Sequence, residues 1–321
     1  MSVVTRAWAE TMRRLQRECN SFQQPGSSKS ISHKFAVAGV HLGYCRPADA
    51  QAILAAVPGV FALEPSTVAN EPAVLTLSPA LNRDSPAART AAVMGVMQAL
   101  RRSNTMEALA GWRDELFAVA PEYGGPVYFE IERAAASLLG VSQFGTHLNG
   151  YVRTGASGNP AQDLKMWVSR RSLTKPTWPG KLDNLCAGGL PSGMSPHENM
   201  RKECSEEASV PAELSGRCVA VGTVSYTSEL SRGIFPECQF VYDLELPESF
   251  QPVSADGEVG EFYLWDVPTI LHSISTPEFK PNCALVFLDF FIRHGILTPD
   301  STPLYPELVS GLHYSGPLAR D

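Results

Sequence analysis

Residues 146–267 constrain the fold of this chain most, because short runs of alternating apolar and polar residues follow one another there. Such alternation predicts half-buried β-strands, and one helical segment, residues 195–208, interrupts them. A second helix is predicted at residues 282–294. A sheet between helical layers is the simplest packing for this order of elements, which predicts an α/β (α+β) fold. The predicted strands are LNGYVR, KMWVSRR, CVAVGTVSYTSE, PECQFVYDLELP and GEFYLWDV.

The residues before this region have the pattern of helices and strands expected of a separate small α/β domain. Apolar residues recur at helical spacing within residues 3–20, and the run FAVAGVHLGY predicts a strand. Helices are predicted at residues 47–56, 86–103 and 106–112, and residues 127–139 begin as a strand and continue as a helix. We therefore predict an N-terminal α/β domain (1–140), a second domain (141–295) and an irregular C-terminal tail (296–321) that packs on the second domain.

Composition narrows the classes of function. Lys and Arg number 26 against 33 Asp and Glu, so the net charge of −7 argues against a nucleic-acid binder. No apolar run approaches the roughly 20 residues of a membrane helix. The seven cysteines form no C-x-x-C motif, which favours a reducing compartment and predicts a cytoplasmic protein. An excess of basic residues among the first 34 leaves an organellar presequence as the alternative.

Three glutamates of the predicted helix 195–208 stand out. Glu203, Glu206 and Glu207 follow at i, i+3 and i+4, so they share one face and repel each other. A hard divalent cation such as Mg²⁺ or Mn²⁺ would reverse that repulsion, because it prefers oxygen ligands. Ser195 and Glu198 have the spacing of a capping box at the start of this helix. The competing interpretation is an ordinary solvated acidic surface.

A glycine-rich segment precedes the acidic helix, and together they resemble a known motif. AGGLPSGMSPHENMRKECSEEASV resembles the box of the Nudix hydrolases, G-x5-E-x7-R-E-U-x-E-E-x-G-U, in which U is aliphatic. Gly188 aligns with the first glycine, and the three glutamates align with the second half of the box. Three positions depart from it: Met194 replaces a glutamate, Lys202 an arginine and Ser209 the last glycine.

Longer strings resemble one branch of this superfamily. WVSRRSLTKPTWPGKLDNLCAGGLPSG and FKPNCALVFLDFFIRHG are similar to Nudix proteins that carry an extra N-terminal domain and are associated with thiamine diphosphate. The resemblance implies a Nudix α/β/α sandwich with a mixed sheet, plus a small N-terminal α/β domain. It also implies a Mg²⁺- or Mn²⁺-dependent diphosphatase that converts thiamine diphosphate, or its oxidised (oxy-, oxo-) analogues, to the monophosphate plus phosphate.

Two other functions stay open at this stage. One is hydrolysis of another nucleoside diphosphate-X substrate, such as ADP-ribose. The other is a non-catalytic Nudix-fold binding module, which Met194 favours because it removes one carboxylate from the box. The expected partner is a small-molecule diphosphate, with neither nucleic acid nor membrane, and a homodimer is left open.

The resemblance also implies roles for individual residues. Glu203, Glu206 and Glu207 would bind metal, with Glu203 or Glu207 as the base. Glu261 is the preferred fourth metal ligand, and Glu258 is its alternative. Trp178, Tyr226 and Phe235 are candidates for stacking on a ring, although an aromatic residue of this kind is more often part of the core. The predicted substrate-binding residues are Arg170, Arg171, Lys175, Gly188, Gly189, Glu237 and Gln239.

Overall fold

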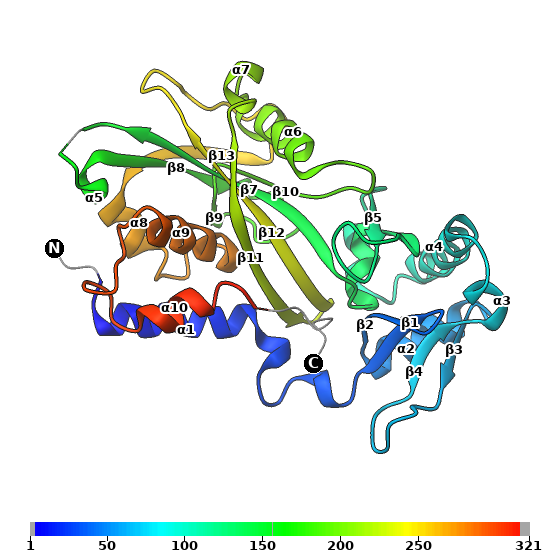
Figure 1. Cartoon of the computed structure of the whole chain (residues 1–321). Coiled ribbons are helices and arrows are strands. Elements are labelled where there is room, and N and C mark those ends of the chain that lie inside the picture. The colour runs from blue at the N-terminus through cyan, green and yellow to red at the C-terminus, as the bar shows by residue number, and fades with distance from the viewer. Residues whose placement is uncertain (1–3, 156, 315–321) are drawn as a thin grey trace.

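A computed structural model describes residues 4–155 and 157–314, and its central feature is a seven-stranded mixed sheet (Figure 1). Its strands are β7 (Gln143–Arg153), β8 (Leu164–Arg171), β9 (Leu182–Asp183), β10 (Cys186–Gly189), β11 (Val219–Leu230), β12 (Gly233–Glu245) and β13 (Val259–Asp266). The order is β11-β12-β7-β8-β13, with β10 paired to β7 and β9 to β8. Strands β12 and β7 run parallel, whereas the other pairs are antiparallel. All five predicted strands are confirmed.

Helices cover both faces of this sheet (Figure 1). On one face α6 (Pro196–Ala208) packs Met200 and Cys204 against Leu148 and Leu185. On the other face lie α9 (Pro281–Arg293), α1 (Arg6–Cys19) and α10 (Tyr305–Ser310). Residues Asn282 to Phe291 of α9 are all buried, because this helix is enclosed by the sheet and by the outer helices. The predicted sandwich of a mixed sheet between helical layers is thus confirmed.

A second, four-stranded sheet forms in the N-terminal half, with the order β2-β1-β4-β3. The run FAVAGVHLGY, predicted as one strand, is a hairpin instead, since Ala38 and Gly39 have positive φ angles of 51° and 79° and reverse the chain. The elements of this half are β1 (His33–Val37), β2 (Val40–Cys45), α2 (Pro47–Ala56), β3 (Phe61–Glu64), β4 (Val74–Leu77), α3 (Pro79–Asn82), α4 (Pro86–Ser103), β5 (Leu116–Val119) and β6 (Phe129–Glu132).

Local signals predicted the helices of this half well. Helices α2 and α4 span the predicted residues, and Ser85 accepts a hydrogen bond from the Ala88 N–H at 3.2 Å, as an N-cap does. The predicted helix at 106–112 is a 3₁₀ helix, η3 (Glu107–Gly111). The segment 127–139 begins as β6 and continues as a 3₁₀ helix, η4 (Arg133–Leu138).

Helix α1 packs against the C-terminal half rather than against the four-stranded sheet. The Trp8 indole N–H donates to the Leu271 carbonyl at 2.6 Å, and the Gln16 side chain donates to the Leu308 carbonyl at 2.6 Å. The tail was predicted to be irregular, but it contains α10, whose Leu308 joins the core around α9. Residues 315–321 of that tail lie outside the described residues. The division at residues 140 and 295 stays a prediction.

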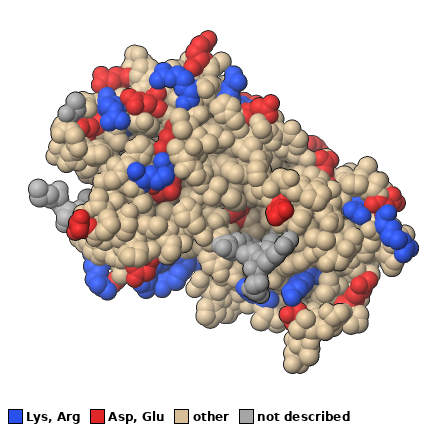
Figure 2. Space-filling view, in the orientation of Figure 1, with Lys and Arg blue, Asp and Glu red and all other residues tan. Residues whose placement is uncertain are grey.

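The remaining helices are short: α5 (Pro160–Asp163), α7 (Ala212–Ser215) and α8 (Val267–Ser273). No helix in the described part of the chain combines the length and apolar character needed to cross a membrane. All seven cysteines are free thiols, and six are buried. Acidic and basic side chains are interspersed on the face that Figure 2 displays.

Candidate active site

Helix α6 is held at both ends. At its start the Ser195 hydroxyl accepts from the Glu198 N–H at 3.3 Å, and the Glu198 carboxylate accepts from the Ser195 N–H at 3.0 Å, so the predicted capping box is present. At its end Ser209 adopts a left-handed conformation (φ 49°), and its hydroxyl donates to the Val253 carbonyl at 2.8 Å. The sequence around the helix thus determines where it begins and ends.

Two of the three glutamates line a cavity of about 200 Å³, which residues of strands β7, β10 and β12 also line. Glu203 is nearly buried, whereas the Glu206 side chain is 48% exposed. Glu207 is buried beside the cavity, and its carboxylate accepts a hydrogen bond from the Ala187 N–H at 2.8 Å. We call this space the acidic cavity. The role of the three carboxylates as metal ligands stays a prediction, and Glu207 lies deeper than the other two.

Charge accumulates around the acidic cavity. The Lys202 ammonium lies 3.2 Å from a Glu203 carboxylate oxygen and 2.9 Å from one of Glu206. Burial raises the pKa of Glu203 above its ordinary value, and burial together with the Glu203 charge raises the pKa of Glu207. Burial lowers the pKa of Lys175, whose ammonium lies 3.9 Å from a Glu207 oxygen. Protein cations therefore offset only part of the cost of burying these carboxylates.

The glycine-rich segment before α6 begins as a strand. Gly188 and Gly189 lie in β10 opposite Thr146 and Gly145 of β7. A Cβ on Gly188 would lie 2.7 Å from one Glu203 carboxylate oxygen and closer still to the other two carboxylate atoms. The absence of that Cβ lets the Glu203 carboxylate lie directly against the strand backbone.

The structure brings together most of the predicted substrate-binding residues. Arg170 is the exception, because consecutive residues of β8 point to opposite faces of the sheet. Its guanidinium donates to the Gly180 carbonyl at 2.8 Å and lies 3.3 Å from the Glu278 carboxylate, away from the acidic cavity. The other predicted substrate-binding residues all line the acidic cavity: Arg171, Lys175, Gly188, Gly189, Glu237 and Gln239.

Of the two candidates for a fourth metal ligand, Glu258 lines the acidic cavity and Glu261 does not. Glu258 contacts the Lys175 ammonium and lies 3.6 Å from the Arg113 guanidinium. The Glu261 carboxylate accepts a hydrogen bond from the Tyr263 hydroxyl instead. An irregularity in the pairing of β13 with β8 falls between Val259 and Glu261 and places Glu261 opposite Arg170, which also lies outside the cavity. The spacing of the two acids in the sequence did not show this irregularity.

Sequence reasoning missed the contribution of the N-terminal half. Arg113 and Arg133 line the acidic cavity, as do Glu115 and Phe117. Lys280, directly before α9, is also part of the lining. No periodicity in the sequence marks these residues, because their grouping depends on how the two halves pack.

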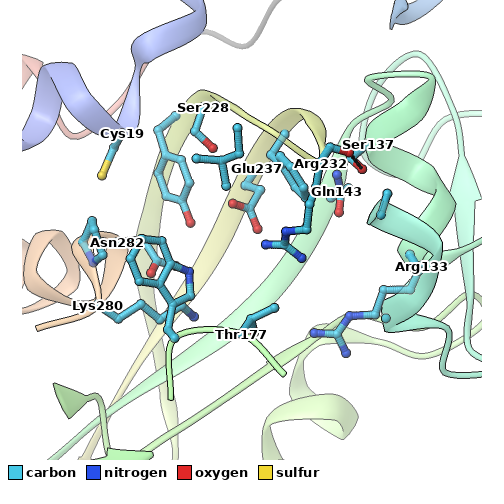
Figure 3. A pocket seen from close by; sticks show the side chains of 18 of the residues that line it. Cys19, Arg133, Ser137, Gln143, Thr177, Ser228, Arg232, Glu237, Lys280 and Asn282 are labelled. Atoms are coloured by element: carbon cyan, nitrogen blue, oxygen red, sulfur yellow. Dashed lines mark hydrogen bonds between the residues drawn. The ribbon is translucent and has the colours of Figure 1, made fainter. Parts of the chain in front are cut away.

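A second cavity of about 340 Å³ adjoins the first, and we call it the aromatic cavity. Figure 3 shows Glu237, Arg232 and Lys280 directed into it, with Arg133 at its side. The three predicted stacking residues, Trp178, Tyr226 and Phe235, all line it. The two cavities share Arg113, Arg133, Gln143, Thr177, Glu237, Lys280 and Asn282.

Glu203, Glu206 and Glu258 at the acidic cavity offer the carboxylate oxygens that a hard cation such as Mg²⁺ or Mn²⁺ prefers, but their oxygens do not all lie within 4.8 Å of one another. A separate buried group, His147, Asp183 and Cys283, has its ligand atoms within 4.8 Å of one another. Its atoms are already engaged, since the Cys283 thiol donates to Asp183 at 2.6 Å and Arg171 binds Asp183 at 2.8 Å. The nearby positive charge of Arg171 disfavours a metal there.

The mixed sheet between helical layers, with a glutamate-bearing helix beside a glycine strand, defines an α/β protein with a candidate site at one cavity. The chain is 43% identical over 70% of its length to Nudix hydrolase 24, chloroplastic, of Arabidopsis thaliana, and 43% identical over 68% to Nudix hydrolase 20, chloroplastic, of the same plant. These identities make it a relative of the named Nudix hydrolases. It covers 59% and 56% of those two proteins, which is less than two thirds of their lengths.

Two further comparisons concern parts of the chain. Residues 11–143 match a family model described as a domain of unknown function (DUF4743). The crystal structure of the NUDIX domain of Shewanella oneidensis NrtR, complexed with ADP ribose, matches 49% of this chain and 90% of its own, with 15% identity and a TM-score of 0.36.

Proposed function

We propose that this protein is a Mg²⁺- or Mn²⁺-dependent Nudix diphosphatase that hydrolyses thiamine diphosphate, or its oxidised analogues, to the monophosphate plus phosphate. The observation that carries the proposal is the acidic cavity, where Glu203 and Glu206 face the same space as Arg171 and Lys175. Carboxylates for a cation and cations for an anion together suit a metal-bound diphosphate. The similarity to proteins named Nudix hydrolases supports the same activity.

In this proposal Glu203, Glu206 and Glu207 would hold the metal ion, with Glu207 just behind the cavity wall, and Glu258, which lines the cavity, replaces Glu261 as the fourth ligand. The ion, when bound, neutralises charge on the phosphate oxygens. Gly188 supports this assignment, because the space left by its missing side chain allows the Glu203 carboxylate to sit against β10.

The protein's own groups then orient substrate and move one proton. Glu203 or Glu207 takes the proton from the attacking water. Arg171 is fixed by Asp183 at 2.8 Å, and Lys175 is fixed by Glu258, so both are preorganised cations for phosphate oxygens. These pairings reduce the reorganisation that binding would otherwise require.

The aromatic cavity is the proposed site of the thiamine rings. Trp178, Tyr226 and Phe235 offer aromatic faces, and the Glu237 carboxylate faces the space that they surround. Glu237 is an acceptor for an aminopyrimidine, and the Gln239 amide, which donates to the Tyr226 hydroxyl at 3.1 Å, lines the adjoining cavity. Burial raises the pKa of Glu237 because it disfavours the charged carboxylate. A hydrogen-bond donor on the ligand would offset part of that cost.

One alternative keeps the fold without catalysis. Met194 stands where the Nudix box has a glutamate, and Lys202 pairs with both Glu203 and Glu206. A protein in which Lys202 occupies these carboxylates would bind a diphosphate without hydrolysing it. A second alternative, a nucleoside diphosphate-X substrate such as ADP-ribose, concerns only the choice of substrate.

Phosphate release in the presence of Mg²⁺ tests these functions. Thiamine diphosphate, oxythiamine diphosphate, ADP-ribose and nucleoside triphosphates form the panel, and Glu203→Gln is compared with Glu213→Gln on α7. We expect the thiamine compounds to be turned over fastest and Glu203→Gln to lose about 10²–10³-fold in rate. Faster turnover of ADP-ribose would favour the alternative substrate. Binding of thiamine diphosphate without turnover would favour the binding module.

A further inference from the structure

Arg133 comes from the N-terminal half, yet its guanidinium lies against the glycine strand. The guanidinium carbon is 3.1 Å from the position that a Cβ on Gly189 would occupy, and Nη1 is 3.3 Å from it. Phe117, also from the N-terminal half, contacts the same position at 2.8 Å. Gly189 therefore leaves the space in which the two halves of the chain meet at the site.

The Arg133 guanidinium has donors left for a ligand. Its Nη1 donates to the Glu115 carboxylate at 3.1 Å, and the group lies over the Phe117 ring at 5.7 Å. Within the described residues no other hydrogen bond from this guanidinium is present, although an arginine carries five N–H donors. Arg133 lines both cavities, so its free donors lie where the two spaces join.

The other Lys and Arg side chains of the acidic cavity, apart from Lys280, each form an ion pair with a carboxylate, as Arg113 does with Glu258 at 3.6 Å. Arg171 binds Asp183, Lys175 binds Glu258, and Lys202 binds Glu203 and Glu206. The Lys280 ammonium makes no hydrogen bond or ion pair with any residue in 4–155 or 157–314, and it lines the same two cavities. Arg133 and Lys280 therefore face the junction with charge that is only partly neutralised.

We propose that Arg133 is a diphosphate-binding residue, which the N-terminal half supplies to the acidic cavity. The inference rests on the proposed function, because it assigns the anion to a diphosphate. The planar guanidinium suits bidentate contact with phosphate oxygens, and Arg133 lines the same cavity as Glu203 and Glu206. The N-terminal half thereby completes the site that the acidic helix begins.

Calorimetric titration with methylenediphosphonate, a diphosphate analogue that resists hydrolysis, tests this assignment in the full chain with Mg²⁺ present. We expect Arg133→Ala to weaken binding by about 10- to 100-fold, and Arg133→Lys to weaken it less. Glu115→Gln removes the ion-pair partner and one negative charge of the cavity but keeps Arg133, so it should not weaken binding. Arg101→Ala is the matched control, because Arg101 stacks on Trp112 and lines neither cavity.

The variants separate binding from a structural role. Wild-type affinity in Arg133→Ala would overturn the inference, and so would an equal loss in Glu115→Gln, which would show that the ion pair alone matters. A wild-type protein that does not bind the analogue would overturn it as well. If the wild type releases no phosphate but its affinity for the analogue depends on Arg133, the inference stands and the proposed diphosphatase activity fails.

Discussion

Replacing Gly188 with alanine should lower the rate of phosphate release without lowering the stability of the protein. The new Cβ would lie 2.7 Å from one Glu203 oxygen and closer to the other two atoms of that carboxylate, whereas ordinary contact begins near 3.4 Å. The carboxylate must therefore move by about 1 Å, and a displacement of that size can reduce a rate by about 100-fold. We expect phosphate release to fall by about that factor.

Stability should hardly change in the same variant. The atoms that the new methyl group meets are the far end of a flexible side chain, and Gly188 does not adopt a left-handed conformation. Adding a side chain to a strand glycine also removes backbone entropy from the unfolded state. We expect the free energy of unfolding to change by less than about 1 kcal/mol.

Phosphate release and urea unfolding, measured on the same samples, give both quantities. Gly95→Ala in α4 is the control, since its Cβ would meet no atom within 4 Å, and it should gain about 0.5–1 kcal/mol while keeping full activity. A Gly188→Ala protein that is correctly folded and releases phosphate at the wild-type rate would refute the reasoning, because the position of Glu203 would then not matter.

Glu207→Gln should keep the hydrogen bond from the Ala187 N–H, so the free energy of unfolding should change by less than about 1 kcal/mol. The rate of phosphate release should fall by about 10²–10³-fold, and full activity would argue against a role for Glu207 as ligand or base. Mg²⁺ at about 100 times its dissociation constant should raise the free energy of unfolding of the wild type by about 2.7 kcal/mol in urea, and EDTA should reverse this increase. The same increase in the double variant Glu203→Gln/Glu206→Gln would contradict Mg²⁺ binding at these carboxylates. Burial, and after it the charge of Lys280, lowers the pKa of His147 to about 4. The folded protein therefore gains stability from neutral His147 above the unfolded pKa near 6.5, and this stability is lost as the pH falls toward 4. Urea titrations should show the wild type losing about 3 kcal/mol more than His147→Gln across that range, and parallel pH profiles would contradict this.

Several features of the site could be predicted from short stretches of sequence. The start of α6 follows from Ser195, Pro196 and Glu198, whose capping interactions lie within one helical turn. The clustering of Glu203 and Glu207 follows from helical spacing alone. These predictions succeeded because the interactions that decide them connect residues only a few positions apart.

Strand alternation separates two of the predicted substrate-binding residues. Arg170 and Arg171 are neighbours on β8 and point to opposite faces of the sheet, so only Arg171 reaches the acidic cavity. The choice between Glu258 and Glu261 was different. It depended on the irregular pairing of β13 with β8, which no local residue pattern predicted.

The sequence alone determined the order of helices and strands, the ends of α6 and the face that carries its glutamates, because backbone hydrogen bonding and helical periodicity act locally. Tertiary structure decided that Arg113 and Arg133 reach the acidic cavity and that Gly189 makes room for Arg133. Such contacts join segments far apart in the chain. They arise from the packing of two apolar cores, whose relative position depends on many side chains at once.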